Sequence, residues 1–133
     1  MSNGFEEVRR RWPYHGPYDQ ERTIEAAEAI AELVRYLNNA IEEPDAVPHP
    51  NTVSGVLSPI AAATRGLEQL LHQILGLVDL TAANARDNRR DRPATATISE
   101  VVAELAGAGV AAEVLAERLE RAARHATHLT AQD

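Results

Sequence analysis

The sequence has no cysteine, no lysine and few aromatic residues, and each shortage narrows what the protein can be. Without cysteine there is no disulfide framework, no thiolate nucleophile and no cysteine-ligated zinc or iron–sulfur site. All 13 basic residues are arginine, which together with abundant alanine is typical of proteins from GC-rich bacterial genomes. Aromatic residues make up 4% of the chain, so their positions are more informative than their number.

Long apolar stretches are missing as well. No segment approaches the roughly 18 consecutive apolar residues that indicate a membrane span. Residues 1–16 include acidic side chains and lack an apolar centre, so we expect no secretory signal. We therefore expect a cytoplasmic protein with no membrane partner.

The balance of charged and apolar residues favours an acidic globular domain. With 133 residues, of which 44% are hydrophobic, the chain is long enough to form one domain with its own core. The formal net charge is −7 at pH 7, and a field of this sign repels phosphate backbones. General nucleic-acid binding is therefore disfavoured.

The spacing of apolar residues predicts three long helices, at about residues 20–42, 52–85 and 98–129. Asp19 is expected to cap the first helix, and the proline-rich segment 43–51 to end it. We place the start of the second helix near residue 52 with a bend at Pro59. A start at Ser58, with Pro59 as the first helical residue, is the alternative.

The second helix has the strongest pattern in the sequence. Its apolar residues alternate steps of four and three and form a heptad seam of Val53, Leu57, Ile60, Thr64, Leu67, Leu71, Ile74 and Val78. A second apolar row lies beside this seam, at Val56, Ala63, Leu70 and Leu77. Because two rows predict apolar contacts on more than one side, we expect this helix to be the central one.

The third helix repeats the heptad rhythm, with Thr97 or Ser99 as its expected N-cap. Its seam consists of Ile98, Val102, Leu105, Gly109, Ala112, Ala116, Leu119, Ala123 and Ala126. Gly107 and Gly109 interrupt this helix, and each interior glycine costs about 1 kcal/mol relative to alanine. They indicate a close crossing against another helix, which we favour because the rhythm continues in phase, or a split of the third helix.

These features predict an all-α fold: an antiparallel, up-down-up bundle of three long helices over residues 19–133, preceded by an N-terminal arm over residues 1–18. At about 1.5 Å per residue, the first helix is about 33 Å long and the other two are about 50 Å each. Roughly 15 Å of apolar surface on the longer pair is then left uncovered. We expect the arm and a second copy of the chain to cover it, which makes the protein a homodimer.

The N-terminal arm contains four of the five aromatic residues, Phe5, Trp12, Tyr14 and Tyr18. Pro13, Gly16 and Pro17 disfavour helix after Arg11. Because Trp, Tyr and Arg are enriched at interaction hot spots, we predict that the partner-binding residues are Trp12, Tyr14, Tyr18, Arg9, Arg10 and Arg11. The arm either straps the bundle or its second copy, or docks on a different protein.

A second arginine cluster lies between the second and third helices and comprises Arg86, Arg89, Arg90 and Arg92. Clustered arginines can bind phosphates, so the alternative function is a small DNA-associated regulatory protein that uses this cluster. Asp87 and Asp91 partly neutralise the cluster, which favours a solvated, charge-balanced loop instead.

The histidines do not form a recognisable metal site. His125 and His128 are three residues apart, but structural zinc takes about four ligands. Glu68 and His72 do not have the Glu-x-x-His spacing of di-iron carboxylate bundles. There is also no nucleophile elbow and no glycine-rich phosphate loop. We therefore expect no cofactor, and a non-enzymatic helical protein–protein interaction module, a small adaptor or regulator whose partner is itself, another protein, or both.

Overall fold

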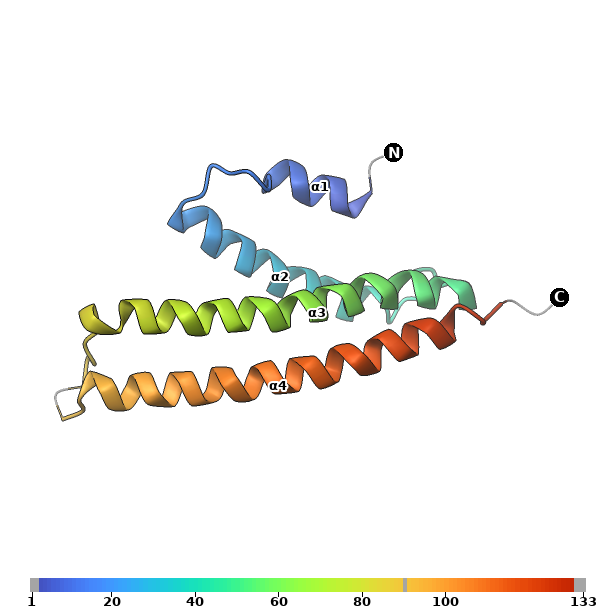
Figure 1. Ribbon diagram of the computed structural model, residues 1–133. Coiled ribbons are helices and arrows are strands. Elements are labelled where there is room, and N and C mark those ends of the chain that lie inside the picture. The colour runs from blue at the N-terminus through green and yellow to red at the C-terminus, as the bar shows by residue number, and fades with distance from the viewer. Residues whose placement is uncertain (1–2, 90, 131–133) are drawn as a thin grey trace. The chain divides into compact units, whose positions relative to one another are not determined.

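The structure, a computed structural model, describes residues 3–89 and 91–130. All of the regular structure in these residues is helical, so the predicted all-α class is confirmed (Figure 1). The elements are α1 (Gly4–Arg11), α2 (Gln20–Ala40), α3 (Pro50–Thr81), a 3₁₀ turn η1 (Ala82–Asn84) and α4 (Ala94–Ala126). The predicted count of three helices is wrong, because α1 forms a fourth α-helix within the N-terminal arm.

The helices group into two compact units, Met1–Pro48 and His49–Asp133. The first unit contains α1 and α2, and the second contains α3, η1 and α4. The division falls in the proline-rich loop between α2 and α3.

The two helices of the first unit begin at side-chain caps. The Asn3 carboxamide oxygen accepts a hydrogen bond from the Glu6 backbone N–H at 2.9 Å, which provides the start of α1 that the sequence reading overlooked. Acidic residues follow in the first turn of α1 and arginines in the last, which suits both ends of the helix dipole. Asp19 caps α2 as predicted, accepting from the Arg22 N–H at 2.8 Å.

In the second unit, α3 and α4 lie side by side and run in opposite directions, which we call the α3–α4 hairpin (Figure 1). Its apolar core within the described residues is made of small side chains, namely Ala61, Ala112, Ala116, Ala123 and Ala126. Thr64 is also buried, and its hydroxyl donates to the Ile60 carbonyl at 2.9 Å, so no polar atom of this side chain is left unpaired. The predicted seam of α4 supplies four of these five alanines.

The boundaries of α3 and α4 differ from the predicted ones by a few residues. Pro50 is the first residue of α3, with His49 as N-cap, because the fixed φ of proline suits the first helical turn. α4 begins at Ala94 directly after Pro93, and neither Thr97 nor Ser99 is its cap. The Thr97 hydroxyl is bonded to Asp87 instead.

α4 is continuous through Gly107 and Gly109, so the predicted alternative of a split helix is wrong. The favoured explanation, a close helix crossing, is not found between α3 and α4. A Cβ atom added at either glycine would meet no heavy atom within 4 Å. The glycines therefore lie where the structure leaves open space, and they are not required by the packing of α3 on α4.

Candidate functional site

The α3–α4 hairpin exposes large apolar side chains beside its alanine core. We call this set the leucine face, and it comprises Leu67, Leu70 and Leu77 of α3 and Leu115 of α4. These side chains are 42%, 42%, 56% and 50% exposed, respectively. Leu70 and Leu77 belong to the second apolar row that the sequence predicted, and Leu67 was assigned to the seam but lies at its edge. The two apolar rows were thus recognised from the sequence, but the exposure of these leucine side chains was not predicted.

The charged residues of the middle of α3 lie away from the leucine face. Arg65 and His72 line a shallow groove on the other side of the hairpin, together with Ala106, Val110 and Glu113 of α4. Successive helical residues are rotated by about 100°, which places these groove residues roughly opposite the leucines on both helices. The leucine face is therefore apolar along the middle of α3, and the groove side is mixed.

The groove side contains an ion-pair cluster that links the two helices. The Arg65 guanidinium donates to both carboxylate oxygens of Glu120, at 2.7 and 3.2 Å, and to Glu68 at 3.0 Å. The hydrogen bonds to Glu120 are the main reason that the pKa of Arg65 is raised, and the same bonds lower the pKa of Glu120. Glu68 is therefore a member of this ion-pair cluster, through its pairing with Arg65. Among the described residues, no three His, Cys, Asp or Glu side chains are placed to hold a metal ion.

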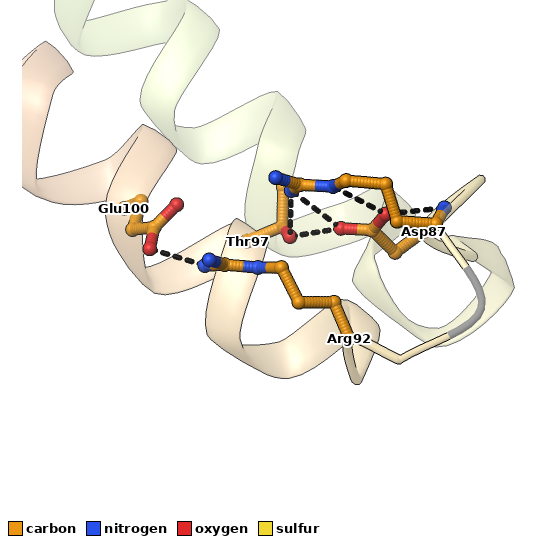
Figure 2. A network of polar contacts seen from close by, with 5 residues as sticks. Asp87, Arg92, Thr97 and Glu100 are labelled. Carbon is orange, nitrogen blue, oxygen red and sulfur yellow. Dashed lines mark hydrogen bonds and ion pairs between the residues drawn. The ribbon is translucent and has the colours of Figure 1, made fainter.

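A second polar cluster closes the turn between α3 and α4 (Figure 2). The Asp87 side chain is only 2% exposed and accepts from the Arg89 backbone N–H at 2.8 Å and from its side chain at 2.9 and 3.0 Å. Thr97 of α4 also donates to Asp87, and Arg92 pairs with Glu100. The bonds from Arg89 and Thr97 hold the pKa of Asp87 well below its usual range. We call this set the Asp87 cluster.

The four arginines that were predicted to contact nucleic acid differ in their surroundings. Arg89 and Arg92 are bonded to carboxylates within the Asp87 cluster and at Glu100. Arg86 is exposed, and Arg90 lies outside the described residues. The sequence did not indicate the Asp87 cluster, because Thr97 has the residue type and position of a helix N-cap.

Of the predicted partner-binding residues, the three arginines form the last turn of α1, and Trp12, Tyr14 and Tyr18 follow it. Tyr14 and Tyr18 are 72% and 76% exposed, and Trp12 is half-buried at the end of α1. The Arg11 guanidinium lies over the Trp12 ring, 5.7 Å from its centroid, as in a cation–π contact. The two preceding arginines bond within α1: Arg10 to Glu7 at 3.0 Å, and Arg9 to the Phe5 carbonyl at 3.3 Å.

α2 has an apolar side that is exposed as well. Ile30, Leu33 and Val34 of α2 and Ile41 at its C-cap are each more than half exposed. The acidic residues Glu21, Glu25, Glu28 and Glu32 recur at three- to four-residue spacing, which places them together on the other side of the helix. α2 is thus amphipathic, with one apolar and one acidic side.

The two C-terminal histidines do not share a helix face. His125 is in the last turn of α4, where a cation is favoured by the helix dipole, and His128 follows the end of the helix. None of the helices in the described part of the chain combines the length and apolar character needed to cross a bilayer. Comparisons with protein-family models, with curated proteins and with solved structures found no match to this chain.

Proposed function

We propose that this chain is a non-enzymatic helical interaction module, a small adaptor or regulator that acts by protein–protein contact and forms a homodimer. One observation carries the proposal. In the described residues, the buried apolar side chains are all alanines, whereas many leucine, isoleucine and valine side chains of α2, α3 and α4 are between 39% and 82% exposed. Large apolar side chains gathered and exposed on one face of a helix or hairpin are characteristic of interaction sites.

The proposed assembly uses α2 and a second copy together. α2 is the third helix of an antiparallel bundle, because its apolar side needs cover and a short loop joins it to α3. With 21 residues against 32 in α3, α2 is about 31 Å long against about 48 Å, so it covers only part of the hairpin. The second copy covers what remains.

The N-terminal arm is the proposed contact for a different protein. Tyr14 and Tyr18 are exposed and Trp12 carries a stacked arginine, which is the residue chemistry of interaction hot spots. The arginine cluster has less support as a DNA contact, since Arg89 and Arg92 are already paired with carboxylates and the net charge is −7.

Light scattering behind a sizing column tests the proposal. We expect a mass of twice 14.5 kDa for the full chain at micromolar concentration, and a dimer also after deletion of residues 1–18. A monomer for the full chain would contradict the homodimer. A dimer that falls to monomer on deletion would instead assign the arm to self-association, against its proposed role.

A further inference from the structure

A row of α3 that is exposed or partly exposed changes in side-chain size along the helix, with Leu70 at its midpoint. Ala63 and Gly66 precede Leu70 and are small, whereas Ile74 and Leu77 follow it and are large. At about 100° per residue these positions lie on one side of the helix, away from the groove residues. Leu70 is seven residues from both Ala63 and Leu77, and four from both Gly66 and Ile74.

We propose that the leucine face binds the same face of a second copy, with the two α3 helices antiparallel and a twofold axis passing near Leu70. This inference rests on the proposed self-association and specifies its interface. In this arrangement Ala63 lies opposite the partner's Leu77, and Gly66 lies opposite the partner's Ile74. In these two pairings a large side chain meets a small one, Leu70 meets its own copy at the axis, and a twofold interface repeats both pairings.

The parallel alternative lacks this match in size. In a parallel pair, each residue of α3 lies near its own copy, so Leu77 would meet the partner's Leu77 and Ala63 the partner's Ala63. One end of the interface would be overfilled and the other would be left with a void, and both conditions destabilise packing.

The area of the leucine side suits a stable dimer. The hairpin is about 48 Å long, from the 32 residues of α3, and about 20 Å wide at a helix spacing of 8–10 Å. Two such faces bury roughly 1,900 Å² in total, which exceeds the ~1,200 Å² lower limit for specific interfaces. A single helix the length of α2 covers only about a third of one face, at roughly 31 Å by 10 Å.

The charges of α3 do not oppose this pairing. Between Ile60 and Asp79, the charged residues of α3 are Arg65 and Glu68, both held in the ion-pair cluster with Glu120. An antiparallel pairing about Leu70 therefore brings no like charges of α3 together.

Because the chain has no cysteine, single cysteines report the geometry directly. We expect Leu70→Cys to form an intermolecular disulfide on mild oxidation, since the two copies of this position meet at the axis. Ala63→Cys alone and Leu77→Cys alone should not cross-link, but an equimolar mixture of these two variants should form a mixed dimer. Gln69→Cys, an exposed neighbour on the groove side, is the matched control and should remain reduced.

A pair of charge variants tests the face without cysteine chemistry. Leu70→Glu is expected to raise the dimer Kd about 100-fold or more, because each copy places an unpaired carboxylate at the axis. Gln69→Glu adds the same charge next to it and should leave the Kd within about twofold. Circular dichroism confirms that both variants are helical.

The outcomes separate the two proposals. Cross-linking of Ala63→Cys and Leu77→Cys each to itself would overturn the antiparallel geometry in favour of a parallel one. A wild-type dimer with no disulfide at Leu70 and an unchanged Kd for Leu70→Glu would overturn the interface while the homodimer stands. A wild-type monomer would overturn both.

Discussion

Replacing Gly107 with alanine is expected to stabilise the protein by about 1 kcal/mol. Gly107 is an exposed residue in the interior of α4, and an added Cβ would meet no atom within 4 Å. The substitution therefore adds the helix propensity of alanine over glycine, about 1 kcal/mol, with no steric penalty. For a chain of this length, the gain corresponds to a rise of about 3–5 °C in Tm.

Urea and thermal unfolding followed by far-UV circular dichroism measure this effect. The matched control is Ala103→Gly, which is expected to lower stability by a similar amount because Ala103 is also an exposed residue of α4. Both variants should keep the wild-type m-value, since neither changes the surface exposed on unfolding. An unchanged or lower stability for Gly107→Ala would refute the reasoning, because it would mean that another helix approaches closely at Gly107.

Two further substitutions probe the core and the turn. Ala116→Leu should destabilise the protein by about 2–3 kcal/mol in the same unfolding assay, because Ala116 is fully buried and the larger side chain overpacks the seam; Ala103→Leu, on the exposed side, should cost less than about 0.5 kcal/mol. The pKa values of Asp87 and Glu120 are lowered in the folded protein, so the stability they contribute is complete above about pH 4 and is lost as the pH falls through the lowered values. Asp87→Asn should therefore be less stable than wild type at pH 7, and the two proteins should converge as unfolding is measured at progressively lower pH; parallel curves would contradict the role of Asp87.

The helices and their seams could be predicted from the sequence because they depend on periodicity. The α4 seam was recognised from its four–three rhythm, and its members Ala112, Ala116, Ala123 and Ala126 are the ones that are buried. Asp19 was found as the cap of α2 because its position before the first helical turn leaves few alternatives. α1 was missed, since eight residues are too few to show a convincing period, and the three arginines at its end read as an arm.

The features that could not be predicted depend on contacts between distant residues. Arg65 and Glu120 are 55 positions apart, and nothing in either local sequence indicates the pairing. Thr97 has the residue type and position of a helix cap, yet its hydroxyl bonds to Asp87 across the turn. The arginine cluster at residues 86–92 could be recognised from the sequence as a charge pattern. The carboxylate partners of Arg89 and Arg92 could be identified only from the structure.

The alanine seam has a consequence for how α3 and α4 find their alignment. From Ala112 onward, four of the five seam positions of α4 are alanine and the exception is Leu119, so the row of methyl groups by itself discriminates weakly between alignments of the two helices. Alignment then has to come from contacts that exist in one position only. Arg65 reaches both oxygens of Glu120 midway along the pair, and Asp87 reaches Thr97 at the turn. A partly exposed ion pair such as Arg65–Glu120 contributes little to stability, but together with the Asp87–Thr97 hydrogen bond it favours one alignment of the two helices over the others.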